Sequence, residues 1–499
     1  MLYLDYSAQH NHFQKIPAAA VFMKGERMMK KTPSLKLNFI MNIILTASAF
    51  LFPVVTSPYV SRILLPEVTG RIAFATSIIS YFALVARLGV PTYGIRACAQ
   101  VQDDLEELTR TAQEIFIINL IMTICVYLVF FASLFFIGQF RQDQRLLLVI
   151  SSTIFLNLFG MDWLYKALEQ YRDITIRSLF FNLAGIILTF LFVHTKEDFV
   201  IYGGITVLAS VGSNLLNFFF AKNYISFAPC RPYHFTRHLK PIFVLFALSV
   251  ATTIYTNLDV VMLRVMTDSQ EVGYYDAVVK MKNLMVTLAT SLGAVLLPRI
   301  SYYVKMNQQS EYMGLLKKSF RFVSLTAAPL CIYFFIMARE SISFIFGNHY
   351  LNAVNAARLI LPTVLLIGLT NVIGIQMLVP LGQEKLVVYS TCAGAAVDVV
   401  LNALLIPRFQ CTGAAAGTLA AEITVLLVQL WFIRPWLSRF KGTFQARKII
   451  TALLPAFILL LVLHRFLHDG NFLTLCVTSF AFFAVYGGCL LLFNYRLNS

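Results

Sequence analysis

Residues 39–64 read FIMNIILTASAFLFPVVTSPYVSRIL and decide the class of fold. The run is longer than the about 20 mostly apolar residues that an α-helix needs to cross a bilayer. Its only charged residue, Arg62, lies near its end. Pro53 and Pro58 fall inside the run, so we expect the helix to bend or unwind there and predict a hinge at these two residues. The run therefore predicts a proline-containing membrane span.

The whole chain shares the composition of this first run. Of its 499 residues, 58% are hydrophobic and 13% are charged, whereas soluble domains carry about 25% charged residues. The 40 Lys and Arg residues outnumber the 24 Asp and Glu residues, which gives a net charge of +16. A nucleic-acid-binding protein would need a water-soluble basic platform, so this class is excluded. The composition is typical of a membrane protein that presents cations to anionic headgroups or to an anionic cargo.

Apolar runs recur to the end of the chain and predict an all-α integral membrane protein of about 14 transmembrane helices. No polar stretch between the runs is long enough for a separate soluble domain. Lys and Arg gather in the loops on the side of the N-terminus, which places both termini in the cytoplasm. The predicted spans are 39–64, 70–90, 114–137, 145–166, 175–194, 200–221, 241–265, 273–298, 319–338, 357–380, 384–406, 412–433, 447–466 and 472–494.

An internal repeat divides these spans into two halves. An arginine, a short polar turn, a glycine and an apolar helix follow one another twice, first from Arg62 through Gly70 and then from Arg264 through Gly273. An even number of spans separates the two copies, so both insert in the same orientation. The predicted parts are a disordered cytoplasmic segment 1–35 with a true start at Met28 or Met29, six-helix bundles 36–222 and 241–435, a cytoplasmic linker 223–240, and a helix pair within 436–499.

Polar side chains inside the predicted spans fall on single helix faces. A charge within the bilayer costs about 2.5–3.5 kcal/mol on insertion scales unless it faces protein or water. The first two spans of each half carry such stripes, which predicts a hydrated cavity between the halves. Polar contacts between packed helices explain isolated hydroxyls equally well, but they explain charges poorly. The stripes are Asn38, Asn42 and Thr46; Ser77, Ser80, Tyr81 and Arg87; Thr252, Thr256 and Asp259; and Asp276, Lys280, Asn283 and Thr287.

The cations near these stripes are candidates for binding an anionic cargo. A guanidinium binds phosphate bidentately and keeps its charge when partly buried. Arg62 and Arg264 are the strongest candidates, because they occupy equivalent places in the two halves. Arg87 and Lys280 are further candidates; alternatively, Arg87 snorkels to the membrane surface and Lys280 pairs with Asp276 along its helix.

Four carboxylates inside the spans are candidates for coupling transport to a cation, or alternatively for satisfying neighbouring helices. They are Asp259, Asp276, Asp398 and Glu422. The eight cysteines are scattered as small apolar residues usually are, so we predict no metal site. The chain has no Gly-Lys dipeptide and therefore no P-loop, and it lacks the short hydrolase motifs. We expect no catalytic residue, no cofactor and no nucleotide.

Residues 52–62, FPVVTSPYVSR, and residues 91–96, PTYGIR, resemble the Wzx-type lipid-linked oligosaccharide flippases. These form the polysaccharide transporter branch of the multidrug/oligosaccharidyl-lipid/polysaccharide (MOP) exporter superfamily. The resemblance extends from about residue 35 to the C-terminus. Leu65 departs from it, because a glycine is frequent at this place in the family. Further matching stretches are 162–165, 257–259, 273–275, 405–407 and 413–417.

The resemblance implies two six-helix bundles in a V shape, as in MATE transporters, with two added helices and alternating access between the bundles. It implies a cargo of undecaprenyl pyrophosphate carrying an oligosaccharide repeat unit, flipped to the outer leaflet of the bacterial cytoplasmic membrane for capsule, O-antigen or exopolysaccharide synthesis. It suggests coupling to Na⁺ or H⁺, and a polysaccharide polymerase and a chain-length regulator as partners. We expect Arg62, Arg96 and Arg264 to hold the pyrophosphate as it crosses.

Three alternatives stay open at this point. A lipid II flippase differs only in its cargo. A MATE-type drug antiporter shares the architecture but favours an acidic cavity, whereas the cavity-facing residues here are mixed and lean cationic. A membrane polysaccharide polymerase needs an outward catalytic loop, and the sequence shows none of sufficient length.

Overall fold

The computed structural model describes residues 35–440, 446–467 and 472–492. These residues form helices joined by short connections and contain no strand, as predicted. The alternative starts Met28 and Met29, and the rest of the predicted cytoplasmic segment up to residue 34, lie outside the described residues. So does the predicted break at 468–471.

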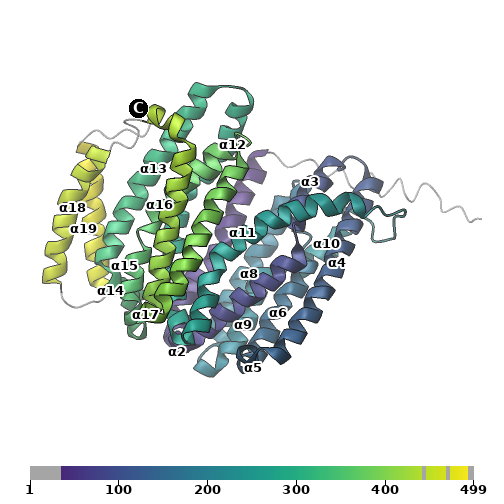
Figure 1. The fold of residues 1–499 in the computed structure, drawn as a ribbon, viewed down its shortest axis with the longest axis horizontal. Coiled ribbons are helices and arrows are strands. Elements are labelled where there is room, and N and C mark those ends of the chain that lie inside the picture. The colour runs from purple at the N-terminus through teal and green to yellow at the C-terminus, as the bar shows by residue number, and fades with distance from the viewer. Residues whose placement is uncertain (1–34, 441–445, 468–471, 493–499) are drawn as a thin grey trace, which may run out of the picture.

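The first part of the chain packs as one group of helices, which we call the N-lobe (Figure 1). The N-lobe consists of α2 (Leu35–Arg87), α3 (Val90–Gln100), α4 (Leu105–Phe136), α5 (Gly138–Gln142), α6 (Gln144–Leu158), α7 (Asp162–Ala167), α8 (Tyr171–Phe192), η1 (Lys196–Asp198), α9 (Phe199–Val211) and α10 (Ser213–Ala221).

The second part forms the C-lobe, and α11 (Thr236–Met266) crosses between the two lobes in Figure 1. The C-lobe consists of α12 (Ser269–Lys305), α13 (Gln309–Ile336), α14 (Ala338–Phe346), η2 (Asn348–Ala353), α15 (Val354–Ile360), α16 (Thr363–Asn371), the π-helix η3 (Val372–Leu378), α17 (Glu384–Phe432) and η4 (Arg434–Phe440). The pair α18 (Ala446–Phe466) and α19 (Phe472–Leu492) lies at the edge of the C-lobe.

Helix α2 is too long to be one crossing. Its 53 residues would extend about 80 Å as a straight helix, whereas the hydrocarbon core is about 30 Å thick. Its backbone leaves the helical conformation at Leu65 (φ 63°, ψ 167°), directly before Pro66, because a residue that precedes proline disfavours the α region. The backbone remains helical through Pro53 and Pro58, so the chain does not unwind there. A hinge at these two prolines stays a prediction.

Helix α17 repeats this arrangement in the C-lobe. It is 49 residues long, and Gln410 (φ 51°, ψ −132°) interrupts it three residues after Pro407. The break predicted between 406 and 412 is therefore confirmed. Two antiparallel arms of α17 result, and their facing surfaces carry buried polar residues.

The described residues include ten helices that are long and apolar enough to cross a membrane. The number rises to eleven if the bent pair Asn348–Ile360 and Thr363–Leu378 forms one span. The protein is thus a multi-pass membrane protein. The breaks in α2 and α17 divide two of these long helices further, while the exact count of fourteen stays a prediction.

Separate apolar cores hold the lobes together. Two clusters of buried apolar residues draw mainly on α2 to α10, and a large third cluster draws on α11 to η4. A fourth cluster attaches α18 and α19 to α13. Ile242, near the start of α11, belongs to an N-lobe cluster, whereas Leu263, near its end, belongs to the C-lobe cluster. Helix α11 is therefore shared between the lobes.

The lobes meet most closely where α2 and α12 cross. A Cβ atom on Gly70 would lie 1.7 Å from the carbonyl oxygen of Ser269, and a Cβ atom on Gly273 would lie 1.9 Å from the carbonyl oxygen of Pro66. Only glycine permits so close a backbone contact. The contact is reciprocal and joins the two glycines of the sequence repeat. We call the contact between residues 66–70 and 269–273 the glycine seam.

Candidate transport cavity and buried carboxylate cluster

A cavity of about 450 Å³ lies between α2, α6 and α11. Among the described residues, Arg87 at the end of α2 is the one charged residue that lines it, and none of them forms an ion pair or hydrogen bond with the Arg87 guanidinium. The other polar lining residues are hydroxyls and amides, and they are Thr76, Ser80, Thr153, Asn157, Ser249, Thr253 and Asn257. The cavity thus presents one free cation among neutral hydrogen-bonding groups.

The predicted stripes match this cavity in part. Ser80 and Arg87 line it as predicted. The α11 residues that line the cavity lie on a neighbouring face of the helix, because Asn257 lines it and the predicted Thr256 does not. The side chain of Thr252 lies outside the described ones. The contribution of α6 was not predicted, because Thr153 and Asn157 stand among apolar residues with no charge beside them.

A second cavity of about 230 Å³ lies between the first arm of α2, α12 and α14. Lys280 lines it, together with Pro53 and Pro58. The Lys280 Nζ atom lies 2.6 Å from Asp276 Oδ2, so the pair predicted along this helix is formed. The cation of this cavity is therefore already neutralised by a neighbour, unlike Arg87.

A buried polar cluster lies inside the C-lobe, where α11, α12 and the two arms of α17 meet. Asp259 is its centre: Asn402 Nδ2 donates to Asp259 Oδ1 at 2.8 Å, and Thr418 Oγ1 donates to Asp259 Oδ2 at 3.0 Å. The Tyr275 hydroxyl also donates to Asp259 Oδ2. Asp398 lies one helical turn before Asn402 and interacts electrostatically with Asp259. We call these residues, with Glu422, the Asp259 cluster.

The Asp259 cluster brings several carboxylates together in a buried place. Asp259, Asp398 and Glu422 are all buried, with exposed fractions of 6%, 2% and 6%. Lys282 interacts electrostatically with all three. Asp398 Oδ1 and Asn402 Oδ1 are buried without a hydrogen-bond partner among the described residues. Carboxylates buried together need a cation or a proton, so the cluster is suited to bind one.

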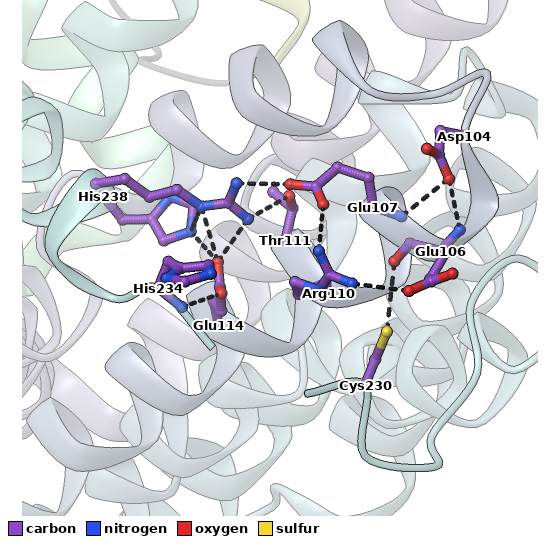
Figure 2. A network of polar contacts seen from close by, with 10 residues as sticks. Asp104, Glu106, Glu107, Arg110, Thr111, Glu114, Cys230, His234 and His238 are labelled. Atoms are coloured by element: carbon purple, nitrogen blue, oxygen red, sulfur yellow. Dashed lines mark hydrogen bonds and ion pairs between the residues drawn. The ribbon is translucent and has the colours of Figure 1, made fainter. Parts of the chain in front are cut away.

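A different polar cluster fastens the start of α11 to the N-lobe (Figure 2). Glu114 of α4 is fully buried and accepts from the His234 backbone N–H at 2.5 Å and from Arg237 Nη2 at 2.7 Å. His238 Nε2 lies 2.5 Å from Glu114 Oε2, and His238 Nδ1 lies 2.7 Å from the Tyr93 hydroxyl. These five residues form the Glu114 cluster, which holds part of the predicted linker 223–240 against α4.

The predicted cargo-binding arginines do not lie together. Arg62 Nη2 donates to the carbonyl oxygen of Phe344, on the opposite lobe. Arg264 Nη2 donates to Gln142 Oε1 at 3.4 Å, also across the lobes. Arg96 is exposed on α3 and lines neither of the two cavities. Arg62 and Arg264 lie at the glycine seam, whereas Arg87 lies in the larger cavity.

The sequence of the chain also matches a known protein family. The polysaccharide biosynthesis protein family matches residues 35–304, which is more than half of the chain. The chain belongs to this family. A relative of this polysaccharide biosynthesis protein, a candidate O-antigen transporter from Escherichia coli (strain K12), is 26% identical over 404 residues, covering 80% of this chain and 97% of the relative.

Two solved structures share the fold of this polysaccharide biosynthesis protein. The lipid II flippase MurJ in an inward closed conformation has a TM-score of 0.70 at 14% identity and covers 92% of this chain and 98% of that chain. An inward-facing MATE family transporter of the MOP superfamily has a TM-score of 0.62 at 13% identity and covers 81% and 99%. The predicted relationship to the Wzx branch of the MOP superfamily and the predicted fold class are confirmed.

The sequence analysis named three members of the Asp259 cluster and missed the others. Asp259, Asp398 and Glu422 were predicted singly as coupling residues. Asn402 and Thr418 were missed, although each lies four residues from a named carboxylate and therefore on the same helix face. Asp276 was grouped with these carboxylates, but its partner is Lys280. Glu114 was also missed.

Proposed function

We propose that this membrane protein is a transporter without enzymatic activity that flips undecaprenyl-pyrophosphate-linked oligosaccharide repeat units to the outer leaflet. Membership of the polysaccharide biosynthesis family supports a role in glycan assembly. The relative from Escherichia coli, a candidate O-antigen transporter, supports transport as that role. The repeat units serve capsule, O-antigen or exopolysaccharide synthesis.

The observation that carries the proposal is the cavity around Arg87. An unpaired guanidinium binds a pyrophosphate oxygen by charge-assisted hydrogen bonds, which are roughly twice as strong as neutral ones. The surrounding hydroxyls and amides, such as Ser80 and Asn257, supply the donors and acceptors that sugar hydroxyls need. Arg87 is therefore the cavity residue that we assign to the pyrophosphate, and Lys280 contributes from the second cavity if its pair with Asp276 opens.

The same cavity argues against a drug antiporter for organic cations. No carboxylate lines the larger cavity among the described residues, whereas a cationic drug needs a negative partner. A lipid II flippase shares the pyrophosphate, so only the sugar-contacting residues separate it from the proposed function. The family membership and the O-antigen relative favour the repeat unit of a polysaccharide.

We propose that the Asp259 cluster couples transport to a gradient of Na⁺ or H⁺. Its oxygen-only donor set suits a hard cation or a proton. Helix α11 joins the cluster to the cargo cavity, because Asn257 lines the cavity two residues before Asp259. A cation at Asp259 would therefore act on the helix that contacts the cargo.

The proposed location is the bacterial cytoplasmic membrane, with both termini in the cytoplasm. The asymmetry of Lys and Arg between the loops supports this orientation. A polysaccharide polymerase and a chain-length regulator are the proposed protein partners, since they would consume the flipped repeat units.

Substitution of Arg87 tests the cargo assignment. We expect Arg87→Ala to reduce glycan export at least about ten-fold, and Arg87→Lys to retain part of it, because a point charge replaces bidentate recognition. Depletion of the protein should accumulate lipid-linked repeat units in the inner leaflet. Arg141→Ala, which removes a guanidinium that lines neither cavity, is the matched control and should change export little. Export that survives Arg87→Ala unchanged would overturn the assignment.

Substitution of Asp398 tests the coupling. Asp398→Asn keeps the side-chain shape but removes the carboxyl that can bind a proton or a cation, so we expect export to lose its dependence on the Na⁺ or pH gradient. Asp276→Asn is the control, because Asp276 pairs with Lys280 outside the cluster. An unchanged gradient dependence in Asp398→Asn would contradict the proposed coupling site.

A further inference from the structure

Arg62 and Arg264 form a reciprocal pair of contacts across the glycine seam. Arg62 extends from α2 of the N-lobe to the Phe344 carbonyl of α14 in the C-lobe. Arg264 extends from the end of α11, which Asp259 fastens to the C-lobe, to Gln142 and to the Phe74 ring of the N-lobe. Each lobe therefore sends one guanidinium to the other.

The acceptors of these two guanidiniums are neutral. A backbone carbonyl binds Arg62, and an amide oxygen and an aromatic ring bind Arg264. By contrast, Arg71, near the same seam, has a carboxylate partner within its own lobe, with its Nε atom 2.5 Å from Asp143 Oδ1. The bond from Arg264 to Gln142 is long, at 3.4 Å, and Arg264 Nε is buried without a partner among the described residues.

Neutral acceptors make these contacts exchangeable. A phosphate oxygen binds a guanidinium more strongly than a carbonyl oxygen does, because both partners are charged. An anion that reached the seam would therefore displace Phe344 and Gln142. Since the two guanidiniums join the lobes, their loss of these acceptors would leave the glycine seam held by backbone packing and by the hydrogen bond of 2.8 Å between Thr69 and Tyr350.

We propose that Arg62 and Arg264 close the glycine seam through these neutral acceptors and exchange them for the pyrophosphate of the cargo, so that the arriving cargo itself opens the seam. The inference rests on the proposed function for the identity of the anion. The closing contacts do not depend on the identity of the anion, because each joins two residues of the chain. The two arginines thus act first as a latch and then as a phosphate site.

The accessibility of residue 269 measures the opening of the seam. Ser269 is buried, and its carbonyl oxygen faces Gly70. We would introduce Ser269→Cys into a chain whose exposed cysteines, Cys125, Cys392 and Cys476, are serine. The rate of labelling by a membrane-impermeant maleimide, in membrane vesicles of both orientations, then reports how often the seam is open.

Alanine variants test the latch without cargo. We expect Arg62→Ala and Arg264→Ala each to raise the labelling rate about two- to ten-fold, which is the equilibrium shift that loss of one hydrogen bond brings. Arg141→Ala is the matched control, because the Arg141 guanidinium bonds to Phe135 within the N-lobe. Labelling of both alanine variants at the rate of the control would overturn the latch.

Glutamine variants with inorganic pyrophosphate test the exchange. Glutamine retains an N–H donor for the neutral acceptor but loses the charge, so we expect Arg62→Gln and Arg264→Gln to stay closed. Inorganic pyrophosphate should raise the labelling rate of the unsubstituted arginine protein and leave the rate of the glutamine variants unchanged. An equal response of both would overturn the exchange. If glycan export proved not to be the function, the alanine result would still stand.

Discussion

Helices α12 and α11 contact the N-lobe at two places, which are built from different interactions. At the glycine seam backbone touches backbone, and the side chains that cross it end on neutral acceptors. At the other end, Gly89 approaches the Ile242 carbonyl oxygen, and the Glu114 cluster holds α11 through a buried carboxylate. Gly70 and Gly89 are separated by about 28 Å of helix.

The difference concerns how readily each end separates. Breaking a buried ion pair leaves an uncompensated charge and costs about 3–5 kcal/mol. Separating two glycine surfaces exposes no charge, because glycine has no side chain. Water also solvates the backbone groups that become exposed. We infer that the base of α11 stays with the N-lobe while the seam opens. Helix α11 must then accommodate the movement between its two fastened ends, along the segment that lines the cargo cavity.

The largest effect is expected from breaking the Glu114 cluster. Glu114→Ala leaves His238 and the His234 amide without this acceptor, while Arg237 keeps its bond to Glu107, so we expect the free energy of unfolding to fall by about 1–3 kcal/mol for each buried group left unsatisfied. Thermal unfolding of the purified protein in detergent measures the change. Glu106→Ala removes an exposed carboxylate of the same helix and serves as the control. Equal melting temperatures for the two variants would remove the contrast between the ends.

A smaller effect is expected from a methyl group placed in the seam. Gly70→Ala cannot keep the closed contact, because its Cβ would lie 1.7 Å from the Ser269 carbonyl oxygen. Overpacking costs about 1–3 kcal/mol, so the seam should open and the labelling of Ser269→Cys should rise at least about five-fold. Gly273→Ala should behave alike. Gly314→Ala, which meets no atom within 4 Å, is the control.

The double variant sharpens this prediction. One separation of the lobes relieves both clashes, so Gly70→Ala with Gly273→Ala should label no faster than either single variant. Residues in one contact are expected to be non-additive in this way. Additive rates would mean that the two glycines open independently, contrary to the reciprocal geometry.

The sequence predicted the helical membrane fold and the equivalence of Gly70 and Gly273, because both follow from local order and composition. It also named Asp259, Asp398 and Glu422 as candidate coupling residues, without placing them together. Their convergence could not be predicted, since it depends on how α11 packs against the two arms of α17. Such contacts between distant segments leave no periodic signal in one sequence.

Two other results show what local patterns can and cannot predict. The prolines of α2 predicted a helix that bends or unwinds; the backbone does not unwind at Pro53 or Pro58, and it leaves the helix at Leu65, in the gap between the predicted spans 39–64 and 70–90. Glu114 was placed at the start of a predicted span, where a carboxylate is ordinary. Its burial depends on a segment 120 residues away, through the bond from His234.

The smallest effect is expected from Gln142→Ala. This substitution removes the amide that accepts from Arg264 at 3.4 Å but leaves the guanidinium over the Phe74 ring, 5.8 Å from its centroid. A long hydrogen bond to a neutral group contributes about 0.5 kcal/mol, so the labelling rate of Ser269→Cys should rise only about two-fold. Because Arg264→Ala removes both contacts, it should open the seam further than Gln142→Ala does. If the two variants label equally, the ring contributes nothing and the amide alone holds Arg264 across the lobes.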